Sequence, residues 1–205
     1  MSSRLGIMVL AGSLVALSAA EGQRSTTVGP VVGVNFATFG GADADNVGTR
    51  TGFLVGGFAA FGLSSRFTLE PSLLYTQKGG EAIFEEDAQG TLKLDYFQIP
   101  LLGRLRFPSG SVTPNFLFGP AMAFRTSCSA SASQGPIEIN VDCDEAEFEI
   151  SSTDFSLIAG IGLEFSQFMV SLRYDYGLTA IPSATSDDVF NRTWSLVAQY
   201  GFRLK

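Results

Sequence analysis

Residues 154–179 read DFSLIAGIGLEFSQFMVSLRYDYGLT, and this stretch decides the fold class. Apolar side chains alternate with polar or small ones through residues 154–165 and again through residues 168–179, with only Ser166 and Gln167 between the two segments. A period of two is typical of a β-strand with two different faces, because successive side chains point to opposite sides of a sheet. The stretch therefore predicts two long antiparallel strands joined by a tight turn.

The same alternation recurs along the chain and predicts eight strands in all. The six further segments are residues 31–38, 51–61, 67–78, 97–107, 116–124 and 194–204. Small residues lie on both faces of 51–61, so the orientation of that strand stays open. The connections alternate in length: 62–66, 108–112 and 166–167 are short, whereas 39–50, 79–91, 125–153 and 180–192 are long. In an up-and-down meander this places all short turns at one end and all long loops at the other.

This pattern predicts an all-β fold, an eight-stranded antiparallel up-and-down transmembrane β-barrel. Such barrels have an even strand number, alternating short and long connections and segments of about ten residues with alternating hydrophobicity. The sheet must close, because an open edge in hydrocarbon leaves backbone N–H and C=O groups unpaired. The alternative is a soluble half-buried sheet or a soluble ligand-binding barrel, in which the apolar face points inward.

Charges in the middle of the polar faces favour the membrane barrel over the soluble alternatives. On the strands defined above they include Glu70, Arg104, Glu164, Arg173 and Asp175. In an eight-stranded barrel the interior is just wide enough to be filled by side chains. We therefore predict that these residues form an ion-pair network that fills the lumen. Glu164 and Arg173 are not directly opposite each other, so a diagonal or network arrangement is expected.

Aromatic residues gather at both ends of the predicted strands, as expected where a barrel crosses two membrane interfaces. The residues beside the short turns are Phe61, Phe67, Phe107, Phe116, Phe165 and Phe168. The residues near the long loops are Tyr75, Phe124, Phe155, Tyr176 and Trp194. A soluble core has no reason to place aromatic side chains in two rings, so we interpret them as two girdles.

The first 20 residues have the layout of a secretory signal peptide. Arg4 is their only charge, residues 5–17 are apolar, and small residues precede Ala20. We expect cleavage after Ala20 or, second, after Gly22. The alternative is a transmembrane anchor, but the apolar run falls short of the ~20 residues that a spanning helix needs. The barrel domain is then residues 21–205.

Composition excludes several kinds of function. The 205 residues contain no histidine, which removes the Ser-His-Asp triad, Cys-His pairs and histidine metal ligands. The net charge of −7 disfavours nucleic acid as a partner, because phosphate binding needs a basic patch.

Two further groups of residues belong to the longest connection. Cys128 and Cys143 are the only cysteines, and an exported chain favours a disulfide between them over free thiols or a metal site. Closing about 15 residues stabilises a loop by roughly 3 kcal/mol on the chain-entropy model.

Asp142, Asp144 and Glu145 carry oxygen ligands suited to Ca²⁺. A solvated acidic rim explains them better, since 15 of the 20 carboxylates, Asp154 included, fall at the loop end. Residues 145–150 alternate and suggest a strand above the membrane.

Three stretches resemble the outer membrane protein β-barrel domain family, whose members are often labelled porin family proteins. They are LLYTQKG (73–79), LDYFQIPLL (94–102) and RYDYGLT (173–179), and the resemblance covers nearly the whole mature chain. It implies a fold similar to OmpA- and OmpX-type barrels and a Gram-negative-type outer membrane. It implies no catalytic residues.

The expected function is that of a non-enzymatic integral outer membrane protein, an envelope scaffold or a display of surface loops. A small-solute pore is the alternative, a soluble ligand-binding barrel is the outsider, and an outer membrane enzyme is disfavoured by the missing histidine. We expect no cofactor, a monomer, and as partners the outer membrane lipids and, during insertion, the barrel-assembly machinery. The long loops are expected to be extracellular and the short turns periplasmic. The sequence names no partner for the loops.

Overall fold

The computed structural model describes residues 26–41, 47–85, 88–134, 137–143, 151–181 and 189–204. The predicted signal peptide, both cleavage sites, Asp144, Glu145 and the alternating segment 145–150 lie outside the described residues. The described residues include no helix that is long and apolar enough to cross a membrane.

Antiparallel β-strands make up the described chain. Their bounds are β1 (Thr26–Gly40), β2 (Val47–Gly48), β3 (Arg50–Gly62), β4 (Phe67–Glu85), β5 (Ala88–Arg106), β6 (Thr113–Gln134), β7 (Ile137–Asp142), β8 (Thr153–Phe165), β9 (Phe168–Gly177), β10 (Phe190–Tyr200) and β11 (Phe202–Leu204).

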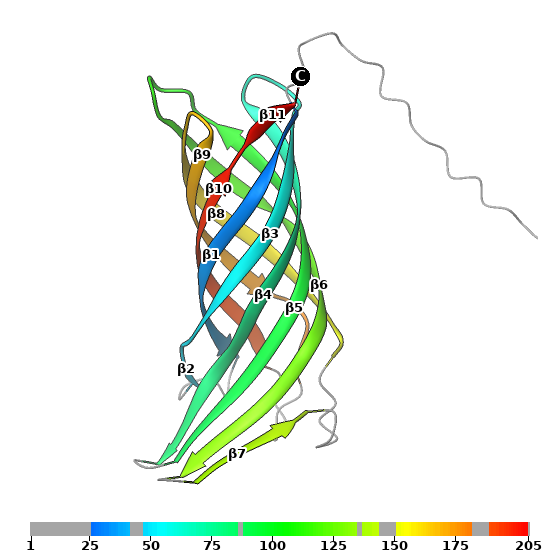
Figure 1. The fold of residues 1–205 in the computed structure, drawn as a ribbon, viewed down its shortest axis with the longest axis vertical. Coiled ribbons are helices and arrows are strands. Elements are labelled where there is room, and N and C mark those ends of the chain that lie inside the picture. The colour runs from blue at the N-terminus through cyan, green and yellow to red at the C-terminus, as the bar shows by residue number, and fades with distance from the viewer. Residues whose placement is uncertain are drawn as a thin grey trace, which may run out of the picture.

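Eight of these strands form a closed barrel, and β11 continues the last of them past Gly201 (Figure 1). The order around the barrel is β1, β3, β4, β5, β6, β8, β9 and β10. Closure comes from the pairing of β10 with β1, from Val31 opposite Gln199 to Gly40 opposite Phe190. The prediction of an eight-stranded antiparallel barrel is confirmed.

The three short turns lie at one end of the barrel, which we call the turn end; the opposite end is the loop end (Figure 1). Ser166 adopts a φ of 60°, which lets Phe165 and Phe168 pair across a two-residue turn. Gly110 has a φ of 62° in the turn between β5 and β6, a left-handed conformation that glycine adopts without steric cost. The turns agree with the alternation of short and long connections seen in the sequence.

The prediction of long loops is wrong for two of the four long connections, because strands occupy much of both segments. Instead of a loop over 79–91, β4 runs on to Glu85 and β5 starts at Ala88, and the two strands stay paired with one shift of register between Ile83 and Glu85. Within 125–153, β6 extends to Gln134 and β7 pairs back onto it. These strands project past the rest of the loop end (Figure 1). Residues 125–134 of β6 have no apolar face, so the pattern of a membrane strand is missing there. Residues 137–142 of β7 read IEINVD and do alternate, so a signal for this strand was present in the sequence.

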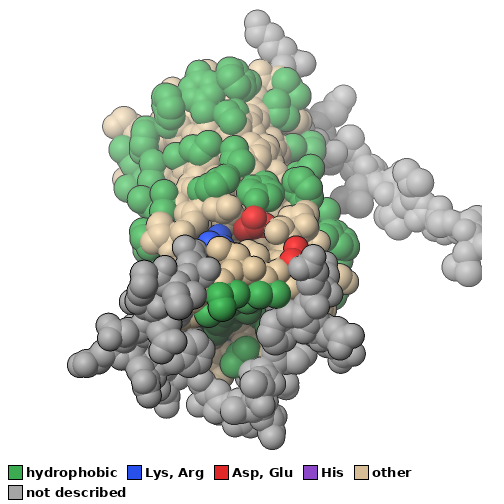
Figure 2. All heavy atoms as spheres, turned by 60° about the horizontal axis from the view of Figure 1, so that its bottom comes forward, with side chains coloured by type: hydrophobic (Ala, Val, Ile, Leu, Met, Phe, Trp, Pro, Cys, Tyr) green, Lys and Arg blue, Asp and Glu red, His purple; other side chains and the backbone are tan. Residues whose placement is uncertain are grey.

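The outer wall of the barrel is apolar, as the membrane interpretation requires. Figure 2 shows hydrophobic side chains spread over it, and Phe116 and Ile161, for example, are 54% and 56% exposed. The orientation of β3 is resolved: Leu54 and Phe58 point inward and Phe53 points outward.

We predicted a lumen filled by charged and polar side chains, but the interior of the barrel also contains apolar ones. Two apolar clusters also occupy it. One contains Val31, Leu54, Phe58, Ala60, Leu74 and Val197. The other contains Leu102, Leu117, Ala121, Ile158 and Met169. The first cluster packs against β3, where small residues lie on both faces. Because of these small residues, the sequence pattern did not show which face of β3 points inward.

Candidate functional site in the barrel lumen

The first buried charge group, the turn-end charge cluster, consists of Glu70, Arg104, Arg106, Glu164 and Arg173. Glu70 is completely buried and forms ion pairs with Arg104 and, at 3.6 Å, with Arg173. Glu164 lies 3.5 Å from Arg104 and 2.8 Å from Arg106. Gln199 donates a 2.9 Å hydrogen bond to Glu70 and accepts one of 2.9 Å from Arg173. Each of these charges therefore has an oppositely charged partner, as buried charges require.

The second group, the loop-end charge cluster, consists of Lys78, Asp154 and Asp175. The Lys78 ammonium lies 2.9 Å from Asp175 and 3.7 Å from Asp154. Gln98 donates a 2.7 Å hydrogen bond to Asp175, and Asn191 donates one of 2.9 Å to Asp154. All these side chains are buried. Along their strands, Leu74 on β4 and Leu102 on β5 separate this cluster from the first.

Both clusters join opposite sides of the barrel. In the closed order of eight strands, β4 and β9 are four places apart, which is the full diameter. The Glu70–Arg173 pair and the Lys78–Asp175 pair each connect these two strands. Side chains therefore bridge the lumen from wall to wall at two levels.

An apolar layer with a disulfide lies at the loop end. Cys128 and Cys143 are joined, as predicted, with Cα atoms 5.4 Å apart. Their neighbours in this layer are Leu94, Tyr96, Ala123 and Ile181. The predicted loop position is wrong for Cys128, which lies in β6 and packs against inward side chains of β5. The bond thus fixes the β6–β7 hairpin to the loop end of the barrel.

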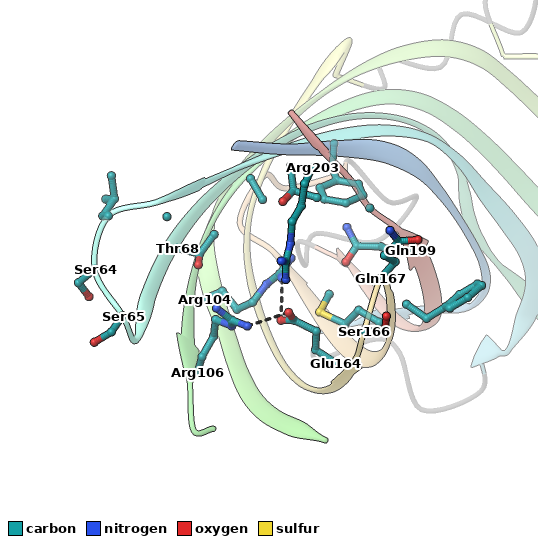
Figure 3. Close-up of a pocket in the computed structure, with 18 residues that line it drawn as sticks. Ser64, Ser65, Thr68, Arg104, Arg106, Glu164, Ser166, Gln167, Gln199 and Arg203 are labelled. Atoms are coloured by element: carbon teal, nitrogen blue, oxygen red, sulfur yellow. Dashed lines mark hydrogen bonds and ion pairs between the residues drawn. The ribbon is translucent and has the colours of Figure 1, made fainter. Parts of the chain in front are cut away.

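A cavity of about 530 Å³ occupies the turn end of the lumen. Figure 3 shows Arg104 and Arg106 from β5 reaching the carboxylate of Glu164 on β8, with Arg203 of β11 also in the lining. Buried Thr68 and Gln199 contribute polar groups. We call this space the mouth cavity; the turn-end charge cluster bounds it on the inner side.

The structure divides the five predicted lumen residues between the two clusters. Glu70, Arg104, Glu164 and Arg173 lie in one, in a network rather than in simple pairs, and Asp175 lies in the other. Lys78, Arg106 and Asp154 were not predicted as members. Asp154 lies at the loop end, as counted, but the interpretation of these carboxylates as a solvated rim is wrong for it, because its side chain is buried in the lumen. Its position on the inward face of the alternating strand was the signal available in the sequence.

The predicted girdle residues lie on the outer wall at the two ends of the barrel. At the turn end, ring contacts join Phe107 to Phe116 at 5.8 Å and Phe165 to Phe168 at 6.4 Å. The outward side chains also include Phe61, Phe67, Phe124, Phe155 and Tyr176. At the loop end, Tyr75 contacts Phe53 and Phe97, and Trp194 contacts Tyr174. Phe53, Phe97, Tyr174, Tyr200 and Phe202 were not in the predicted rings.

Metal binding finds no support in the part of the chain that the structure describes. There, no group of three or more His, Cys, Asp or Glu side chains is placed to hold an ion. Asp144 and Glu145 lie outside it.

Comparison with solved structures returns outer membrane barrels of low sequence identity. Ail, the attachment invasion locus protein of Yersinia pestis, is 18% identical, with 86% of this chain and 98% of that chain covered and a TM-score of 0.42. Neisserial surface protein A is 14% identical, with coverages of 86% and 97% and a TM-score of 0.45. OprG from Pseudomonas aeruginosa is 11% identical, with coverages of 88% and 97% and a TM-score of 0.45. No curated protein matches the chain.

A family comparison covers most of the sequence. The sequence model described as "Outer membrane protein beta-barrel domain" matches residues 18–182. This match agrees with the closed barrel, its apolar outer wall and its charged lumen. The chain belongs to the outer membrane protein beta-barrel domain family and is an integral protein of the outer membrane.

Proposed function

We propose that this protein is a non-conducting, non-enzymatic barrel that holds an extended β-hairpin structure at the cell surface. The observation that carries the proposal is the bridging of the lumen by Glu70–Arg173 and Lys78–Asp175, which join diametrically opposite strands. A water column through the barrel would have to displace both bridges and the apolar side chains between them. Removing one partner of such a pair leaves a buried charge uncompensated, which opposes opening.

The scaffold role follows from the parts of the barrel that extend past the membrane strands. The projecting β4–β7 strands present exposed apolar side chains such as Ile139, which is 58% exposed. The disulfide between Cys128 and Cys143 joins the end of β7 to β6 at the base of this projection. We propose that the loop end is extracellular and the turn end periplasmic, and that the barrel is a monomer in contact with lipid on all sides. Closure within one chain supports the monomer.

Surface labelling tests the display. In a Cys128→Ala/Cys143→Ala background, Ile139→Cys on β7 should react with a membrane-impermeant maleimide on intact cells. The matched control is Ser111→Cys in the exposed turn between β5 and β6, which should react only after the outer membrane is permeabilised. The reverse pattern of labelling would overturn the proposed orientation.

Liposome swelling tests the absence of conduction. Vesicles containing the purified barrel should swell in a small sugar no faster than empty vesicles. Sugar-dependent swelling that scales with the amount of folded protein would instead support the small-solute pore.

A further inference from the structure

The mouth cavity has an excess of positive charge. Among the described residues, those with a charge in its lining are Arg104, Arg106 and Arg203, against Glu164 alone. Glu70 and Arg173 lie just behind the lining, so the whole region holds four guanidinium groups and two carboxylates. The short connections at this end, 62–66, 108–112 and 166–167, add Arg66 and no acidic residue. The field at the turn end therefore favours an anion.

The cavity also offers hydrogen-bond donors that the described chain does not use. A guanidinium has five N–H donors and no acceptor. The side chain of Arg203 makes no hydrogen bond or ion pair with the described residues, and that of Arg106, which is 30% exposed, pairs with Glu164 through Nη2. Residues 62–65 and 166–167 of two short turns also line the cavity. The guanidinium N–H groups that remain accessible in the cavity can donate charge-assisted hydrogen bonds to an anionic oxygen.

The size and form of the cavity suit a small molecule. Its volume of about 530 Å³ lies within the usual range for ligand pockets, roughly 300–1,000 Å³. Buried Arg104, Thr68 and Gln199 line it, and the bridge from Glu70 to Arg173 lies behind them. A molecule that enters from the turn end therefore meets closely packed side chains and binds instead of passing through.

We propose that the mouth cavity binds a small organic anion through carboxylate or phosphate groups, with Arg106 and Arg203 as its principal contacts and Arg104 deeper inside. Guanidinium groups bind both kinds of anion in a bidentate manner, which is why the two share one site. The inference goes beyond the proposed scaffold function. It does not depend on the side of the membrane that the turn end faces.

Arginine side-chain NMR of the full barrel in zwitterionic detergent tests this directly. Inorganic phosphate and succinate are titrated separately at constant ionic strength, with chloride as the balancing anion. The Nε–H signals of Arg106 and Arg203 should shift saturably, whereas that of Arg66, which lies outside the cavity lining, should not. Saturation with only one probe identifies the group that the site prefers. Saturation with neither overturns the proposal.

Three variants separate a specific site from general attraction, and each is checked for folding by its mobility on unheated gels. Arg106→Gln/Arg203→Gln should weaken binding about tenfold or more, because charge-assisted hydrogen bonds are lost. Glu164→Gln removes the only carboxylate in the lining and should tighten binding. Arg66→Gln is the matched control: it removes one positive charge outside the lining and should weaken binding far less than Arg106→Gln/Arg203→Gln. Equal weakening by Arg66→Gln, or weaker binding in Glu164→Gln, would contradict a site in the cavity.

Discussion

Glu70 holds the turn-end charge cluster together. It is fully buried and faces two arginines, Arg104 from the neighbouring strand β5 and Arg173 from the opposite side of the barrel. Gln199 completes its shell with a hydrogen bond. A change at this one residue leaves two buried guanidinium groups with fewer partners.

We expect Glu70→Ala to lower the free energy of unfolding by roughly 3–5 kcal/mol, the usual cost of removing one partner of a buried ion pair. Urea unfolding of the barrel in lipid vesicles measures this. Glu81→Ala is the matched control, since Glu81 lies on the same strand but is exposed, and its effect should be small. Equal stability of Glu70→Ala and wild type would show that the cluster does not stabilise the barrel.

The Lys78–Asp175 bridge leads to a separate prediction about the interaction free energy between its two side chains. Lys78→Ala, Asp175→Ala and the double variant form a double-mutant cycle across the lumen. Because the two side chains are 2.9 Å apart and buried, we expect an interaction free energy on the order of 2 kcal/mol. Additive effects of the two single changes on unfolding would contradict a direct bridge between β4 and β9.

Sequence alone placed Glu70 and Asp175 in the lumen but did not pair them with their partners across the barrel. Alternation puts Lys78, Asp154 and Asp175 inside the barrel, because the other face of each strand must meet lipid. Their contacts, however, join β4 to β8 and β9, which are not neighbours in the sheet. Such contacts depend on the stagger of all the strands between them, and local patterns carry no information about it.

At the scale of elements, alternation predicted the membrane strands well and the projecting strands poorly. β8 and β9 begin and end within two residues of the segments expected from residues 154–179. The extensions of β4, β5 and β6 were missed, since residues 125–134, for example, have no apolar face; β7 was missed although residues 137–142 (IEINVD) alternate. Alternation is thus informative where hydrocarbon contacts one face of a strand.

The disulfide stabilises one such element, the β6–β7 hairpin. We predict that Cys128→Ala/Cys143→Ala still assembles the barrel, because the membrane strands close through β10 and β1 without it. Amide hydrogens of β7 should exchange faster, consistent with a local loss of up to about 3 kcal/mol. Hydrogen exchange read by mass spectrometry measures this, and chemical reduction of the wild type should give the same change. Failure of the variant to reach the outer membrane would show that assembly needs the bond.

At the scale of the whole molecule, the barrel has a continuous ring of paired strands. Such a ring leaves no open edge from which unfolding can begin in the membrane. We therefore predict that the purified protein changes mobility on SDS gels only after heating. Identical migration of heated and unheated samples would contradict a closed, detergent-resistant ring.

The central claim is that side chains close this lumen from wall to wall. Planar bilayer recording of the purified wild-type protein tests it most directly, with folding and insertion verified beforehand by the heat-dependent gel shift. We predict no steady conductance at either polarity, because the Glu70–Arg173 and Lys78–Asp175 bridges and the apolar clusters leave no continuous path for ions. A stable channel with a linear current–voltage relation would contradict the account and identify the protein as a small pore.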